Sequence, residues 1–169
     1  SSTARPKGLI MSSPLKLAES NDIADNIEEP SINMIFSSVE IFEEIKSEPG
    51  AVSLLTNLMK SRKFSKGEFI FREGEVDGEL FILVSGAATV FMHTPDGEKY
   101  QVVSFKDGSH PAFGEGSLID SSPHSASVFC ETDCVCYILS KDHLVELGNK
   151  HPEWAMKLYR KIAEVFLVR

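Results

Sequence analysis

Apolar residues near the start of the chain recur at helical spacing. Phe36 to Ile45 forms one amphipathic stretch and Leu54 to Met59 forms another, and the Pro49-Gly50 pair between them is of the kind that ends a helix. The two stretches predict short helices that lead into a domain over residues 32–63. Residues 1–31 contain Ser, Pro, Asn and acidic residues with only scattered apolar positions, so we expect a flexible segment there.

After Phe64 the apolar positions alternate or run together, which is typical of strands rather than helices. Glycine, aspartate and proline divide this region into short pieces, and the Pro-Asp-Gly turn at residues 95–97 predicts a hairpin. Short strands at roughly ten-residue spacing predict a sandwich or barrel and not a parallel α/β sheet. The predicted strands are Glu68–Arg72, Leu80–Val84, Ala87–Met92, Lys99–Phe105, Ser125–Cys130 and Cys134–Leu139.

The end of the chain is predicted to be helical again. Ser140 can cap a helix over Lys141–Gly148, and Pro152 stands at the first position of a second helix, where proline is tolerated. Apolar residues along this second helix recur every three or four positions, which predicts a face that packs in the core or against a second subunit. They are Trp154, Leu158, Ile162, Val165 and Phe166.

Composition narrows the possible partners. The chain has 169 residues, with 17 Lys and Arg against 25 Asp and Glu, so its formal net charge is −8. This acidic balance counts against nucleic acid and against an anionic membrane surface as partners. No apolar run approaches the roughly 18 residues of a membrane span, and the start lacks the apolar stretch of a signal peptide. Three closely spaced cysteines are not a secreted disulfide framework, so we expect a cytoplasmic protein.

Metal binding and catalysis find little support in the residue pattern. Cys134 and Cys136 would face the same side of a strand, but a zinc site usually needs four ligands and no second pair follows, so buried small hydrophobes are the favoured interpretation. A cupin metalloenzyme would need a His-x-His pair, which the chain lacks. No nucleophile–base arrangement stands out either. We therefore expect neither a metal nor an enzyme.

One segment carries candidate binding chemistry. Residues 113–120 interrupt the strands with a glycine-marked turn into a possible helical turn. The small residues Gly116 and Ser117 leave backbone N–H groups accessible at a helix start, where phosphate is commonly held. Glu115 supplies a carboxylate that could accept hydrogen bonds from sugar hydroxyls. Taken alone, such a turn is more often structural than functional.

The order of the parts resembles the cyclic nucleotide-binding domain of catabolite activator proteins, protein kinase A regulatory subunits and cyclic-nucleotide-gated channels. The family's phosphate-binding cassette reads Phe-Gly-Glu-x-(Ala/Ser)-Leu, then, after a short gap, Pro-Arg-(Ser/Thr/Ala)-Ala-(Thr/Ser)-Val. Residues 113–118 and 123–128 match at every position except one. Residues 64–75 and 80–86 are similar to the family's first strands. The resemblance covers about Val52 to Arg169. It implies an eight-stranded jelly-roll β-barrel with flanking helices, the domain itself occupying residues 64–169.

The exception is His124, which stands where the family places the arginine that pairs with the cyclic phosphate. Histidine is shorter than arginine and mostly neutral at pH 7. Losing a hydrogen bond to a charged group could weaken binding by about ten- to a hundredfold. The resemblance implies that Glu115 meets the ribose, that the amides of Gly116 and Ser117 meet the phosphate, and that Ser125 meets the phosphate or base. The predicted ligand-binding residues are Phe113, Gly114, Glu115, Gly116, Ser117, Leu118, His124, Ser125 and Ala126.

The expected function is a regulatory ligand-sensing module that binds a cyclic nucleotide, with cyclic AMP favoured over cyclic GMP and with weakened affinity. The resemblance also implies a homodimer through the last helix, which would move to signal, and a protein effector. The alternative is a degenerate domain that keeps the fold as a scaffold and binds no nucleotide. In a further alternative, a transcription factor, any DNA-binding domain would lie outside these 169 residues.

Overall fold

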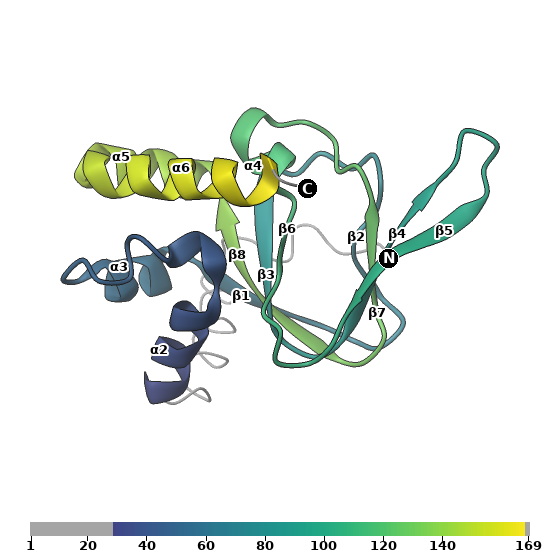
Figure 1. The fold of residues 1–169 in the computed structure, drawn as a ribbon, viewed down its shortest axis with the longest axis horizontal. Coiled ribbons are helices and arrows are strands. Elements are labelled where there is room, and N and C mark those ends of the chain that lie inside the picture. Colours follow the sequence, from purple (N-terminus) through teal and green to yellow (C-terminus); the bar gives the residue numbers. More distant parts are fainter. Residues whose placement is uncertain (1–28, 168–169) are drawn as a thin grey trace.

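The computed structural model of the protein describes residues 29–167, with side chains from residue 34 onward, so most of the segment predicted to be flexible lies outside the described residues. Eight antiparallel strands form two sheets of four, and most of the helices lie beside the first sheet (Figure 1). The first sheet has the order β1 (Lys60–Phe64), β8 (Cys134–Ser140), β3 (Glu79–Ser85) and β6 (Ala112–Phe113). The second has the order β2 (Phe69–Phe71), β7 (Ser127–Cys130), β4 (Ala88–His93) and β5 (Lys99–Phe105).

The prediction of eight strands is confirmed, whereas the closed barrel is not, because in the described part of the chain the strands form two separate sheets. Six strands lie within one or two residues of their predicted bounds. The other two, β1 and β6, were not predicted. The sequence of β1 is Lys-Ser-Arg-Lys-Phe, which lacks an apolar alternation, and β6 has only two residues. Both are outer strands of their sheet, where a strand pairs on one side only.

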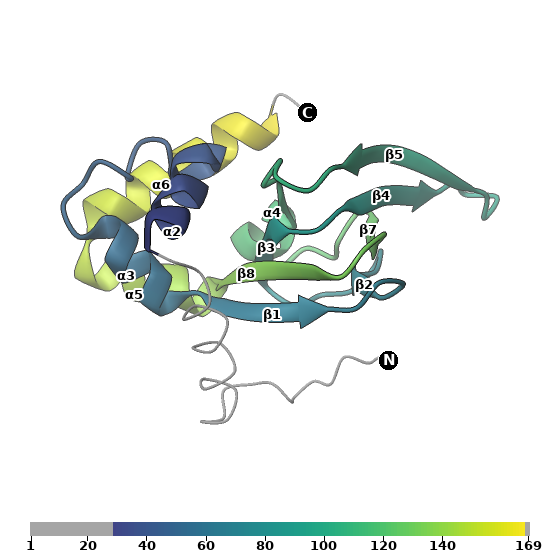
Figure 2. The same cartoon turned by 90° about the horizontal axis from the view of Figure 1, so that it is seen from below.

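The helices are α2 (Glu29–Ser38), the 3-10 turn η1 (Glu40–Phe42), α3 (Ala51–Leu58), α4 (Glu115–Asp120), α5 (Lys141–Lys150) and α6 (Pro152–Leu167). Figure 2 shows that α2, α3, α5 and α6 gather on the side of the first sheet that faces away from the second. The molecule thus has three layers, with the first sheet in the middle. No helix among the described residues is long and apolar enough to cross a membrane.

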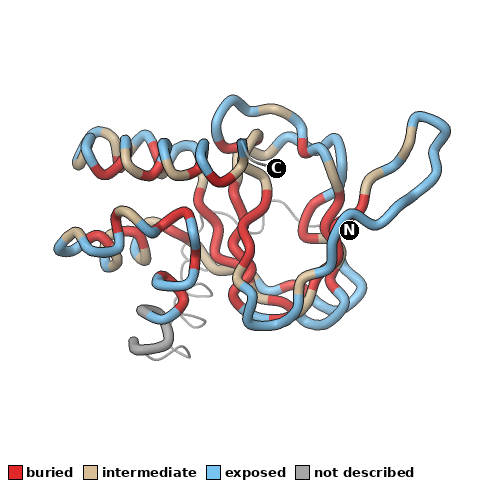
Figure 3. The backbone as a smooth tube through the Cα atoms, in the orientation of Figure 1, coloured by how far each residue is buried: buried red, intermediate tan, exposed pale blue. Residues whose placement is uncertain are grey.

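Side chains alternate across the first sheet and divide the core in two. Buried residues lie along the strands and along the helices (Figure 3). On β8, Cys136 and Ile138 face the second sheet, whereas Tyr137 and Leu139 face the helices. The cysteines behave as the small buried hydrophobes that were predicted: all three are buried, and burial raises the pKa of the Cys136 thiol. We call the core between the sheets the inner core and the core under the helices the outer core.

The C-terminal helices pack as their apolar spacing predicts. Ser140 caps α5 by accepting a hydrogen bond from the backbone N–H of His143 at 3.1 Å, and the His143 side chain accepts in return from the Ser140 backbone N–H. The helix continues past Gly148, the predicted end, to Lys150. The side of α6 that packs in the outer core carries Trp154, Ala155, Leu158, Ile162 and Val165.

Three acidic residues between positions 43 and 48 form ion pairs with α6. Glu43 pairs with Lys161 at 2.7 Å, Glu44 pairs with Arg160, and Glu48 pairs with Lys157. Hydrogen bonds from the lysines lower the pKa of Glu43 and of Glu48 below the usual 4.5. The N-terminal helical segment is thus tied to α6 by charge as well as by apolar packing.

These ion pairs predict an acid-sensitive stability. A carboxyl whose pKa is lowered by folding contributes stability above its ordinary pKa and loses that contribution as the pH falls through its folded value. The free energy of unfolding should therefore decrease between about pH 6 and pH 3, and Glu43→Gln with Glu48→Gln should remove part of that decrease. Urea denaturation across this range measures it. Glu40→Gln is the control, because Glu40 has no ion pair among the described residues; an equal effect in the control would contradict the prediction.

Candidate functional site

The turn at residues 113–118 lies where the first sheet ends. Phe113 of β6 pairs with Phe81 of β3, and the chain then turns at Gly114 into α4. Gly114 has a φ of +91°, which side-chain-bearing residues rarely adopt. A Cβ atom there would lie 2.8 Å from Cε1 of His124 and 2.9 Å from the backbone oxygen of Glu79. Only glycine therefore fits the turn that brings β3, α4 and His124 together.

The short helix α4 is anchored on one side and free at its start. Leu118 is fully buried in the outer core, and its N–H makes the first backbone bond of the helix, to Gly114 O at 3.2 Å. The N–H groups of Glu115, Gly116 and Ser117 precede that bond, so they have no acceptor within the helix. Glu115, the first residue of α4, is half-buried. The predicted amides and Glu115 therefore belong to one turn.

His124 is buried below this turn, with 4% of its surface exposed. Its ring stacks on Phe71 of β2, with centroids 3.7 Å apart and planes inclined by 13°. Its backbone is held by the loop that precedes β3: His124 N–H donates to Glu75 O at 2.9 Å, and Gly74 N–H donates to His124 O at 2.8 Å. The side chain is thus fixed against the inner core.

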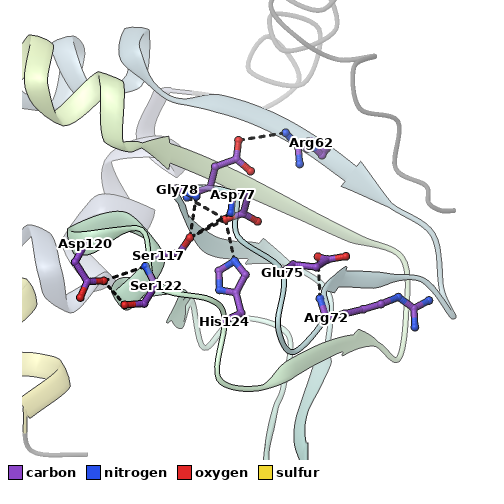
Figure 4. A network of polar contacts seen from close by, with 10 residues as sticks. Arg62, Arg72, Glu75, Asp77, Gly78, Ser117, Asp120, Ser122 and His124 are labelled. Carbon is purple, nitrogen blue, oxygen red and sulfur yellow. Dashed lines mark hydrogen bonds and ion pairs between the residues drawn. The ribbon is translucent and has the colours of Figure 1, made fainter.

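The imidazole is hydrogen-bonded to Asp77, a residue that the sequence did not single out beyond its place in an Asp-Gly turn. His124 Nε2 lies 2.9 Å from Asp77 Oδ1 (Figure 4). Because an ionised carboxylate can only accept, Nε2 carries the proton in this contact. Asp77 Oδ1 also accepts from the Ser117 hydroxyl and from Glu79 N–H, each at 3.1 Å. Asp77 Oδ2 is buried and has no partner among the described residues.

Ser117 completes this network from the cassette side. Its hydroxyl is buried, accepts from Gly78 N–H at 2.8 Å and donates to Asp77. The side chain therefore points into the protein, and only its amide faces the turn.

Two positively charged residues lie near the network. Arg62 pairs with Glu79 at 3.7 Å and lies over the Phe81 ring, and Arg72 stacks on Phe69.

The remaining predicted residues lie at the edge of the site. Ser125 is exposed, and Ala126 is partly buried against the inner core. The turn, α4 and residues 123–126 thus form one continuous cassette, with Asp77 beneath it. No group of three or more His, Cys, Asp or Glu residues in the described part of the chain could hold a metal ion. The arrangement supplies amides and one carboxylate for binding.

Comparison with known proteins agrees with this geometry. A family model described as the cyclic nucleotide-binding domain matches residues 61–151, more than half of the chain. A CRP-like cAMP-activated global transcriptional regulator of Mycobacterium tuberculosis is 29% identical over 129 residues, which are 76% of this chain and 56% of the relative. A cAMP-dependent protein kinase regulatory subunit of Emericella nidulans is 32% identical over 108 residues, 64% of this chain and 23% of the relative.

Solved structures show the same fold. A cyclic nucleotide-binding domain from Methylobacillus flagellatus superposes with a TM-score of 0.70 at 22% identity, covering 83% of this chain and 76% of that one. The chain spans little more than half the length of its M. tuberculosis relative and under a quarter of the kinase subunit. These relatives therefore contain regions with no counterpart in the 169 residues.

Proposed function

The chain belongs to the cyclic nucleotide-binding domain family, and from that premise we propose that it is a regulatory module that binds cyclic AMP with an affinity lowered at His124. The observation that carries the proposal is the cassette itself. Gly114 makes the required turn, the first amides of α4 have no acceptor within the helix, and the half-buried Glu115 is the first residue of that helix. A cyclic phosphate and a ribose hydroxyl are the groups that such amides and such a carboxylate would bind.

Cyclic AMP is proposed over cyclic GMP because the two relatives described above are named for cyclic AMP. The lowered affinity is supported by the contact between His124 and Asp77. The imidazole is buried, its Nε2 proton is directed to a carboxylate, and it lacks the permanent charge of an arginine. We include in the proposal a homodimer through α6, where Met156 and Tyr159 are exposed outside the packed face, and a protein effector.

Replacing Glu115 tests the proposal. Glu115→Ala should weaken cyclic AMP binding by about ten- to a hundredfold, because a hydrogen bond to a charged group contributes about 1.5–3 kcal/mol. Isothermal titration with cyclic AMP and cyclic GMP measures the effect on the purified chain. Glu98→Ala, in the exposed turn between β4 and β5, is the matched control and should bind as the wild type does. An unchanged affinity in Glu115→Ala would show that the ligand binds elsewhere.

A second candidate is a scaffold that keeps the fold and binds no nucleotide. The specific observation in its favour is again the buried His124–Asp77 pair, which stabilises the cassette from below without any ligand. In this case neither cyclic nucleotide would give a titration signal with the wild-type chain. The same experiment therefore decides between the two candidates.

A further inference from the structure

Asp77 occupies a position that bears on which ligands the cassette can hold. It lies in the loop between β2 and β3, outside the cassette, yet its Oδ1 accepts from both cassette side chains that point inward, Ser117 and His124. About a fifth of its side-chain surface is exposed, and Oδ2 is buried without a partner among the described residues. A negative charge is thus held directly under the turn that is proposed to receive an anion.

Resting on the proposed function, we propose that Asp77 sets the discrimination of this site against anionic ligands. It acts as a positioning residue for His124 and as a fixed negative charge beneath the cassette. His124 Nε2–H is the donor that could approach a phosphate. In the structure this N–H donates its hydrogen bond to Asp77 instead. An anion must then compete with Asp77 for this proton or bind by the α4 amides alone.

The charged residues around the cassette have partners other than Asp77; Lys141, for example, donates from Nζ to Ser121 Oγ at 3.1 Å. Glu79 is paired with Arg62, and Glu75 accepts a hydrogen bond from the Arg72 backbone N–H at 3.1 Å, with the Arg72 guanidinium stacked on Phe69. The Arg62 guanidinium is therefore already paired with the Glu79 carboxylate. Among the described residues, the carboxylate of Asp77 accepts hydrogen bonds from a hydroxyl, a backbone N–H and the imidazole, and no Lys or Arg side chain forms an ion pair with it. Its charge therefore acts on whatever binds above it, and charges in a partly buried site are weakly screened.

A neutral ligand with the same sugar and base would not be repelled by the negative charge of Asp77. Adenosine carries the ribose hydroxyls that Glu115 can accept from, but it has no phosphate. The charge of Asp77 should therefore lower the affinity for cyclic AMP and leave the affinity for adenosine nearly unchanged. A purely structural role for Asp77 would affect both ligands equally, so the ratio of the two affinities separates the two roles.

Asp77→Asn tests the inference, because asparagine keeps the shape and an oxygen that can accept from Ser117 and Glu79. Titration of the full chain should show cyclic AMP binding about tenfold tighter in Asp77→Asn than in the wild type, with adenosine affinity changed by less than about twofold. Asp96→Asn, in the exposed turn between β4 and β5, makes the same change in net charge and should alter neither affinity. Asp77→Ser repeats the comparison if the asparagine N–H groups are not tolerated where Oδ2 is buried.

The outcomes separate this inference from the proposed function. If Asp77→Asn leaves cyclic AMP binding unchanged, or shifts both ligands by the same factor, Asp77 does not discriminate by charge and the inference is overturned while the proposed function stands. If the wild type and both neutral variants bind neither ligand, the proposed function fails and this inference fails with it.

Discussion

Replacing Gly114 by alanine is expected to destabilise the protein by about 2–5 kcal/mol and to abolish ligand binding. The backbone there has a φ of +91°, and holding an alanine in the left-handed region costs about 1–2 kcal/mol. The new methyl group would also lie within 3 Å of the His124 ring and of the Glu79 backbone oxygen. Neither can move aside easily, since the ring is stacked on Phe71 and the oxygen belongs to β3, so overpacking adds about 1–3 kcal/mol.

Gly97→Ala is the matched control for this variant. Gly97 has a φ of +90°, but a Cβ atom there would meet nothing within 4 Å. The control should therefore lose only the 1–2 kcal/mol of backbone strain, and the difference between the two variants measures the crowding under the cassette. Urea denaturation gives both free energies. Equal losses would show that the cassette yields to the methyl group and that Gly114 is needed for its φ alone.

Phe81→Ala should destabilise the protein by about 3–5 kcal/mol, the usual cost of removing a buried phenyl ring. Phe81 is fully buried in the inner core, with the Phe71 ring at 5.4 Å and the His124 ring at 6.3 Å. The cavity would remove support from the stack that holds His124, so the cyclic AMP binding proposed above should weaken as well. Chemical denaturation and titration measure the two effects.

Tyr100→Ala is the control for the loss of an aromatic side chain. Tyr100 lies on β5 with 48% of its surface exposed, so its removal should cost less than about 1 kcal/mol. A loss in Phe81→Ala no larger than in this control would mean that the inner core closes around the cavity without cost, and that Phe81 does not support the cassette.

The sequence predicted those elements whose apolar pattern is strong. The continuous apolar run of β3 and the cap at Ser140 were both placed within a residue. Strand β1 was missed because Lys60, Arg62 and Lys63 leave it without the apolar alternation of a strand. Its extended structure comes from pairing with β8. A partner 70 or more residues away cannot be recognised from the local pattern of a single sequence.

The cassette could be found from its motif, but the contacts of His124 could not. The motif indicated which side chain replaces the family's arginine. It does not predict which group the shorter imidazole contacts. Asp77 lies 47 positions before His124, in a turn whose Asp-Gly pair reads only as a turn signal. The structure was needed to show that the turn residue and the substituted residue meet.

The alternation on β3 and β8 has a consequence for how this domain can diverge. Adjacent residues of one strand serve different cores, since Phe81 and Ile138 lie between the sheets whereas Ile82 and Tyr137 lie under the helices. Substitutions at one set of positions change the packing between the sheets, and substitutions at the other set change the packing under the helices. The two cores can therefore diverge by separate mutations on the same two strands, and a designer could randomise either set while holding the other constant.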